Sequence, residues 1–130
     1  MEIAPDPALH EALTAHVAQW VDLFNKGEVS ALDRLYEDVG VLVPVPGHPV
    51  VGPERSAVNA RLLSFGVPLE ARLRRCYTAD DIALLVIDWS LKGTDPDGNE
   101  ISMAGTATDV VRRGADGIWR YVIDNPSGIE

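Results

Sequence analysis

Residues 81–125 decide the fold, and they read DIALLVIDWSLKGTDPDGNEISMAGTATDVVRRGADGIWRYVIDN. The tetrapeptides DPDG, at 95–98, and GADG, at 114–117, have the composition of tight turns. The runs around them are rich in apolar and β-branched residues, which favour strands. We therefore expect strands at roughly 81–92, 100–113 and 117–125. Strands joined by connections this short pair in the antiparallel sense.

Asp88 interrupts the most apolar of these strands, next to Trp89. A carboxylate in such a place must find a partner, remain protonated or face a cavity. Alternation places it with Leu84, Val86 and Ser90, but both faces of the strand are largely apolar, so the pattern does not identify the pocket face. In a pocket, desolvation raises its pKa and makes it a usable general acid or base. Otherwise it is a structural residue, hydrogen-bonded to backbone, to a hydroxyl or to a second subunit.

The sequence before residue 81 carries mostly helical signals. Asp6 and Pro7 are suited to begin a first helix, and Gly27 is suited to end it. Between them lies one apolar stripe at helical spacing, made of Leu9, Leu13, Val17, Trp20, Leu23 and Phe24. We also expect a short helix at 31–36, a hairpin at 41–51, a third helix opening at 52–54 and a strand at 69–78. Helices followed by antiparallel strands indicate the α+β class.

The composition excludes several classes of protein. A length of 130 residues, 46% of them hydrophobic, suits a single domain, 1–130, with one core. The apolar run 82–87 is too short to span a bilayer, and the N-terminus lacks a signal-peptide pattern, so we expect a cytoplasmic protein. The net charge of −9 argues against binding nucleic acid or membrane. One cysteine, Cys76, and three histidines without ligand spacing predict no metal and no cofactor.

Several motifs along nearly the whole chain carry a resemblance to a known family: Phe24-Asn25-Lys26-Gly27, Leu35-Tyr36, Val41-Leu42-Val43-Pro44, Gly52-Pro53-Glu54, Asp88-Trp89-Ser90-Leu91 and the run 116–126. In the order of its expected helices and strands, and in the turn residues between them, the chain resembles the nuclear transport factor 2-like superfamily. The resemblance is to its small SnoaL-like and ketosteroid-isomerase-like bacterial members in particular. The resemblance implies a cone, in which three N-terminal helices pack on a strongly curved antiparallel sheet around a pocket. It also implies a homodimer formed through the sheet face. The superfamily includes isomerases, polyketide cyclases, dehydratases, epoxide hydrolases and non-catalytic binding domains, so function must be argued from the site.

Three residues are the candidates for catalysis: Asp88, Tyr36 and Asn125. Asp88 is the expected proton carrier, and Tyr36, at the end of the second helix, is an expected donor to an oxyanion. Asn125 is preferred over its neighbour Asp124 because it alternates with the aromatic residues of the last strand. The structural alternatives are a core tyrosine with its hydroxyl at the surface and an ordinary strand-ending turn.

The candidates for ligand binding are mostly large aromatic residues, namely Trp20, Phe24, Trp89, Trp119 and Tyr121, together with Asp109. Such aromatics can line a flat apolar pocket, although packing in the core is the alternative interpretation. Asp109 and Asp88 could form an acid/base pair on adjacent strands, as the epoxide-opening members of the superfamily use. The expected register separates them, however, and a solvent-facing Asp109 beside Arg112 is the alternative.

Two classes of function are consistent with the sequence. The first is a cofactor-free isomerase, cyclase or dehydratase that acts on a hydrophobic, carbonyl-bearing small molecule by acid/base chemistry. The second is a non-catalytic module that binds a hydrophobic small molecule or assembles as a dimer. The position of Asp88 separates them, because on the outer face of the sheet it cannot serve the pocket.

Overall fold

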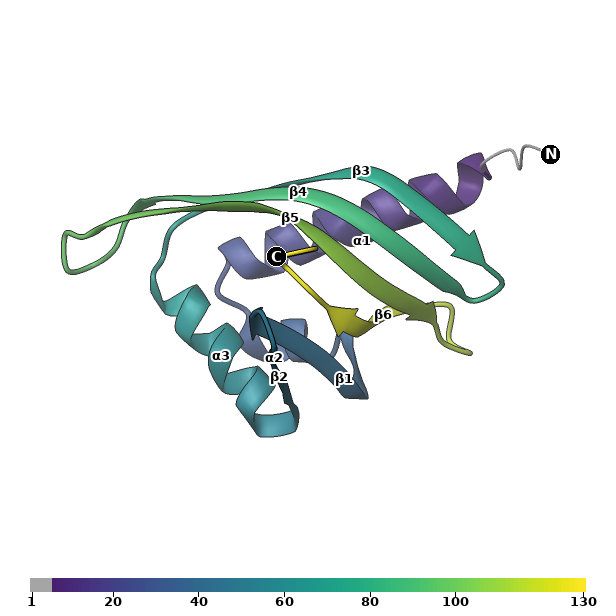
Figure 1. Ribbon diagram of the computed structural model, residues 1–130, viewed down its shortest axis with the longest axis horizontal. Helices are drawn as coiled ribbons and strands as arrows, with labels where there is room; N and C mark the ends of the chain where they lie inside the picture. The colour runs from purple at the N-terminus through teal and green to yellow at the C-terminus, as the bar shows by residue number, and fades with distance from the viewer. Residues whose placement is uncertain (1–5) are drawn as a thin grey trace.

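A computed structural model describes residues 6–130, which form three helices and six strands (Figure 1). In chain order the elements are α1 (Pro7–Asn25), α2 (Val29–Asp33), β1 (Tyr36–Val45), β2 (His48–Val51), α3 (Gly52–Ser64), β3 (Leu69–Ala79), β4 (Ile82–Thr94), β5 (Glu100–Arg113) and β6 (Trp119–Asp124). The strands make one curved sheet with the helices on its concave side (Figure 1). The expected α+β cone is therefore confirmed. No helix of the described part of the chain has the length and hydrophobicity needed to cross a membrane.

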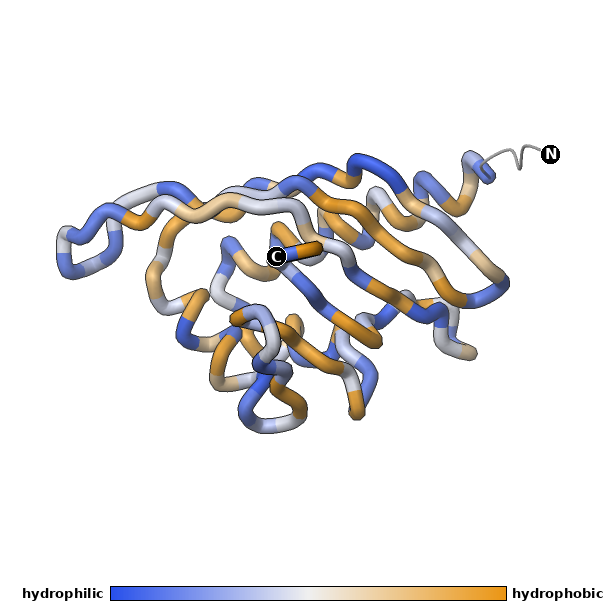
Figure 2. Tube along the Cα trace, viewed as in Figure 1, coloured by the Kyte–Doolittle hydropathy of each residue, from blue (hydrophilic) through white to orange (hydrophobic). Residues whose placement is uncertain are grey.

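The sheet has the strand order β2-β1-β6-β5-β4-β3. All neighbouring strands are antiparallel except β1 and β6, which run parallel. The long hairpin of β4 and β5 pairs Asp88 with Thr106 and Leu85 with Asp109. Figure 2 shows a long apolar stretch in β4, paler colours along the middle of β5 and a hydrophilic turn between the two strands. The expected antiparallel arrangement of the C-terminal strands is thus observed.

Helix α1 begins and ends where its sequence signals indicate. The Asp6 carboxylate accepts hydrogen bonds from the backbone N–H groups of Ala8 and Leu9, at 2.9 and 3.4 Å. Gly27 follows the helix with a φ of +71°, a conformation in which glycine is favoured. The apolar stripe of α1 is buried against the sheet, with Leu13 fully inaccessible to solvent. This packing places the C-terminal half of α1 beside the cavity described below.

Two local details differ from the expectation, and both shape the site. Helix α2 ends at Asp33, and Tyr36 begins β1 instead of ending a helix, because it pairs with Tyr121 across the parallel strands. In β6, Val111 pairs with Tyr121 while Val110 pairs with Ile123, so Val122 is an extra residue on that strand. Such a bulge reverses the alternation of side chains. Asp124 is therefore buried, and Ile123 is exposed.

Candidate functional site

An apolar cavity of about 220 Å³ lies between α1, α3 and the inner face of the sheet. Its lining includes Trp20, Phe24, Trp89, Tyr121 and the aliphatic residues Val17, Leu42, Val58, Leu62, Leu69, Ile87 and Leu91. The lining has few polar side chains. They are Asn59, Asp109, Asp124, Ser127 and Tyr121. An apolar cavity with a few convergent polar groups is typical of a small-molecule site.

Two buried carboxyl groups meet in the wall of this cavity. Asp109 comes from β5 and Asp124 from the end of β6, and the two buried carboxyl groups lie close enough for each to affect the pKa of the other. Asp109 Oδ1 also accepts a hydrogen bond of 2.7 Å from the backbone N–H of Asn125. Asp124 Oδ2 accepts one of 2.5 Å from the Tyr36 hydroxyl, which itself accepts one of 3.1 Å from Asn59 Nδ2. The pair is thus held from β1, α3 and the C-terminal turn.

The surroundings of the pair decide which carboxyl group keeps a proton. Burial, followed by the neighbouring charge of Asp124, raises the pKa of Asp109 well above its usual range. Burial also raises the pKa of Asp124, but hydrogen bonds from Tyr36 and Asp109 act in the opposite direction. The Tyr36 hydroxyl donates to Asp124 and not to Asp109, and this hydrogen bond favours the ionised form on the Asp124 side of the pair. Two carboxyl groups this close titrate as one coupled unit.

Tyr121 places a hydroxyl close to the pair. Burial raises its pKa well above 10.0, and the charges of Asp109 and Asp124 add to the effect. Its ring lies edge-on to that of Trp20, with 4.9 Å between the ring centroids. Tyr121 also belongs to the lining of the cavity, as Asp109 and Asp124 do.

Asp88 does not belong to this site, and the expectation that it faces the pocket is wrong. Its side chain lies on the outer face of the sheet, where Arg74 donates two hydrogen bonds of 2.6 and 3.0 Å to it. Thr106 Oγ1 and Arg72 Nη2 donate further hydrogen bonds, at 2.9 and 3.3 Å. Hydrogen bonds from Arg74 and then Thr106 hold the pKa of Asp88 below its ordinary value, opposite to the expected rise. The inner face of β4 instead presents Trp89 to the cavity.

Asn125 and Trp119 also lie outside the cavity lining. The Asn125 amide donates hydrogen bonds to Thr108 Oγ1, at 3.1 Å, and to the Gly128 carbonyl, at 2.8 Å. Its side chain therefore holds the C-terminal turn, which corrects the expectation of an oxyanion donor. Trp119 is buried in the core, with the Arg113 guanidinium 5.3 Å above its ring.

The other expected residues are at or beside the cavity. Trp20, Phe24, Trp89, Tyr121 and Asp109 line it. Asp109 is only 3% exposed, so the solvent-facing alternative is wrong for this residue. The Tyr36 hydroxyl reaches the site through Asp124 and is committed to that carboxylate.

Sequence reasoning missed Asn59 and ranked Asp124 below Asn125. The signal for Asn59 was its spacing of four from Arg55 on α3, which puts both polar residues on one helix face. Both are buried in the structure. Asp124 was hidden by the bulge at Val122, which a regular alternation does not reveal. Within residues 6–130 no three His, Cys, Asp or Glu side chains are grouped to hold a metal ion.

Several solved structures share this fold. A ketosteroid isomerase-like protein from Erwinia carotovora atroseptica is 22% identical, with a TM-score of 0.73, covering 92% of this chain and 95% of that chain. A protein from Catenulispora acidiphila in complex with S-DNPA is 20% identical, with a TM-score of 0.72 and 92% coverage of both chains. A nuclear transport factor 2-like superfamily protein from Salmonella enterica is 15% identical, with a TM-score of 0.74, covering 91% of this chain and 89% of that chain. At these identities the likeness concerns the fold.

Comparison of the sequence with curated proteins and with protein families gave different results. No curated protein matches the chain. Residues 17–122, however, match the SnoaL-like domain, and this stretch contains α3, the part of α1 that borders the cavity, Asp109 and most of β6. The chain belongs to the SnoaL-like domain family.

Proposed function

We propose that this protein is a cofactor-free acid/base enzyme that acts on a small, apolar, carbonyl-bearing molecule. The observation that carries the proposal is the Asp109–Asp124 pair in the wall of an otherwise apolar cavity. Perturbed carboxyl groups that share a proton are a recurrent feature of acid/base sites. Asp109 and Asp124 thereby take the role that the sequence assigned to Asp88.

The chemistry begins with the ionised carboxylate of Asp124. It removes a proton from a carbon next to the ligand's carbonyl group, and the electron pair of that C–H bond passes into an enolate. In this proposal the Tyr121 hydroxyl donates a hydrogen bond to the enolate oxygen, which is supported by the place of Tyr121 in the cavity lining. In an isomerisation Asp124 returns the proton to a different carbon of the ligand. In a cyclisation the enolate carbon attacks a second carbonyl group, and Asp109 gives its proton to the alkoxide that forms.

Tyr36 supports this chemistry from outside the cavity lining, and Asn59, which belongs to the lining, holds the Tyr36 hydroxyl. The Tyr36 hydroxyl donates to Asp124 and accepts from Asn59, so its one donor is already used. The aromatic lining supports a hydrophobic ligand, and the complex of the Catenulispora acidiphila protein with S-DNPA is an example of a bound molecule on this fold. Isomerisation, dehydration and aldol-type cyclisation are the reaction types that fit such a site.

The test uses proton exchange, which does not require the natural substrate. 2-Tetralone is a neutral, apolar ketone with exchangeable hydrogens next to its carbonyl group. Binding is measured first, as a rise in the melting temperature. Exchange of those hydrogens for deuterium is then followed by NMR in deuterated buffer, with and without the protein. We expect the wild-type protein to accelerate exchange and the Asp124→Asn variant to lose between about 100-fold and 10,000-fold of that acceleration.

Asp88→Asn is the matched control, because it makes the same chemical change on the outer face of the sheet. It should bind 2-tetralone and exchange its hydrogens as the wild type does. Exchange that persists in Asp124→Asn contradicts the assignment. Binding without exchange in the wild type supports the alternative function, a non-catalytic module for hydrophobic small molecules.

We also infer that the partner at the outer face of the sheet is a second copy of this chain. Three large apolar side chains are exposed on this face, Tyr77 by 59%, Leu84 by 38% and Ile123 by 39%. Exposed apolar residues that gather on one face of a sheet indicate an interaction surface. Light scattering should find a dimer for the wild type and a monomer for Leu84→Lys. Ile118→Lys, in the turn before β6, is the control that should remain dimeric. A monomeric wild type at micromolar concentration excludes this inference.

A further inference from the structure

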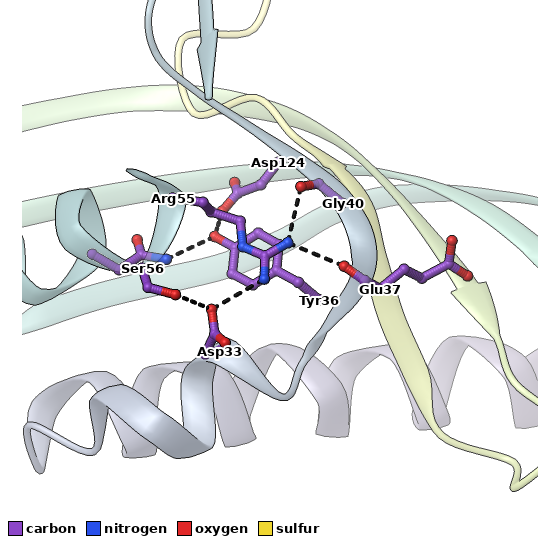
Figure 3. A network of polar contacts seen from close by, with 8 residues as sticks. Asp33, Tyr36, Glu37, Gly40, Arg55, Ser56 and Asp124 are labelled. Atoms are coloured by element: carbon purple, nitrogen blue, oxygen red, sulfur yellow. Dashed lines mark hydrogen bonds and ion pairs between the residues drawn. The ribbon is translucent and has the colours of Figure 1, made fainter. Parts of the chain in front are cut away.

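A buried cation lies behind the acid/base pair, on the side away from the cavity. The Arg55 side chain, from the first turn of α3, is only 5% exposed. Its Nη1 donates hydrogen bonds to the carbonyl oxygens of Glu37 and Gly40, at 3.0 and 2.9 Å, and its Nη2 donates one of 3.0 Å to Asp33 Oδ1. Figure 3 shows these contacts converging on one guanidinium group. Three elements, α2, α3 and β1, thus meet at Arg55.

The guanidinium group covers the ring of Tyr36. Its central carbon lies 4.3 Å from the ring centroid, which is within cation–π distance. The hydroxyl at the edge of that ring donates the 2.5 Å hydrogen bond to Asp124 (Figure 3). Tyr36 is therefore held between a cation on its face and a carboxylate at its hydroxyl.

Stability alone gives a poor account of this arrangement. Burying a guanidinium group is costly, and an apolar side chain of similar size is often as stabilising or more so. Among the described residues, Arg55 Nε has no hydrogen-bond partner, which adds to the cost. The surrounding residues nevertheless accommodate the group closely. The Asp33 carboxylate is fixed by a 2.5 Å hydrogen bond from Ser56, and a side chain at Gly40 would come within 3.2 Å of Arg55 Nη1.

We propose that Arg55 is a positioning residue, which holds the Tyr36 ring in place so that its hydroxyl stays hydrogen-bonded to Asp124. The proposal rests on the proposed function only where it treats the Asp109–Asp124 pair as catalytic. The planar fork of the guanidinium group is what fixes the ring, because it reaches two carbonyl oxygens and one carboxylate at once. A lysine retains the positive charge and loses the fork.

The experiment is an NMR titration of the aspartate carboxyl carbons in the wild type, in Tyr36→Phe and in Arg55→Lys. Loss of the Tyr36 hydrogen bond should move the titration of Asp124 to higher pH, because that bond favours its ionised form. We expect Arg55→Lys to move it in the same direction, by less than Tyr36→Phe does. The other titratable groups that face Asp124 are Asp109 and Tyr121, and they are present in every variant.

The double variant decides whether Arg55 acts through Tyr36. Arg55→Lys added to Tyr36→Phe should cause no further shift, because the hydroxyl that it positions is already absent. Additive shifts overturn the proposal, since they indicate an effect of Arg55 on the pair that does not pass through the Tyr36 hydroxyl. An unchanged Asp124 titration in Arg55→Lys, with the Tyr36→Phe shift present, overturns it as well.

The titration is independent of catalysis. If the wild type does not exchange the hydrogens of 2-tetralone but Arg55→Lys shifts Asp124, the positioning role stands and the proposed function fails. Should Arg55→Lys not fold, Asp33→Asn tests the same point, because it removes the carboxylate that orients the guanidinium group. In Asp33→Asn we expect the titration of Asp124 to move to higher pH by less than it does in Tyr36→Phe. An unchanged titration in Asp33→Asn overturns the proposal.

Discussion

The pH dependence of stability offers a sharp test of the buried carboxyl pair, through the variant Asp109→Asn. The amide has nearly the same size, can still accept the Asn125 N–H and can still donate to Asp124. In the wild type, burial raises the pKa of Asp109, so the native state keeps a proton that the unfolded chain releases above pH about 4. The native state binds more protons than the unfolded state, and stability therefore falls as pH rises through this window. Asp109 contributes about 1.4 kcal/mol to that fall for each pH unit, up to its native pKa.

Urea denaturation followed by tryptophan fluorescence, from pH 4 to pH 8, measures the effect. Asp109→Asn should become progressively more stable than the wild type as pH rises, and the difference should level off above the native pKa. Asp88→Asn is the control, because hydrogen bonds from Arg74 lower the pKa of Asp88 and its contribution to stability is lost only below the unfolded value of about 4. Its difference from the wild type should therefore stay nearly constant from pH 4 to pH 8. A difference between wild type and Asp109→Asn that is the same at every pH refutes a raised pKa for Asp109.

Three further predictions concern the surroundings of the site. Burial lowers the pKa of His16 to about 4, so between pH 6.5 and 4 the wild type should lose about 3 kcal/mol of stability that His16→Phe retains, as urea melts at the two pH values will show. Gly40→Ala should cost about 1–3 kcal/mol, because its Cβ would stand 2.7 Å from the Tyr121 carbonyl oxygen; a neutral effect in the same assay contradicts this contact. Trp89→Phe removes the 2.8 Å hydrogen bond to the Pro126 carbonyl oxygen, which should cost about 0.5–1.5 kcal/mol and speed carboxypeptidase trimming of the C-terminal turn.

The parts of the fold that local chemistry controls could be predicted from the sequence. The cap at Asp6, the apolar stripe of α1 and the turn tetrapeptides at 95–98 and 114–117 act over a few residues, and the structure has them where expected. The start of β1 could not be predicted in this way. Tyr36 follows a short helix, and it is drawn into a strand by pairing with Tyr121, which is 85 residues away in the chain. Such pairing overrides local preference.

The candidate site was harder to predict because it depends on which face of a strand points inward. The aromatic lining could be predicted, since large apolar residues face the cavity whatever their register. Asp88 and Asp109 lie on adjacent strands, and one step of alternation decides that the first is outside and the second inside. For Asp109 a signal was present, because Ala107 and Val111 flank it on the same face and both are apolar. For Asp124 the bulge at Val122 removed the signal.

Asp88 and Asp109 together show why a carboxylate in an apolar strand does not identify a site by itself. Asp88 meets two arginines and a hydroxyl group, so its charge is compensated and its pKa falls. Asp109 meets a second carboxyl group in a buried place, so its proton is retained and its pKa rises. An arrangement of the second kind costs folding free energy, which a hydrophobic residue in the same position would not. Because acid/base chemistry needs a retained proton beside an ionised acceptor, the costly pair, and not the compensated charge, is where function is to be sought.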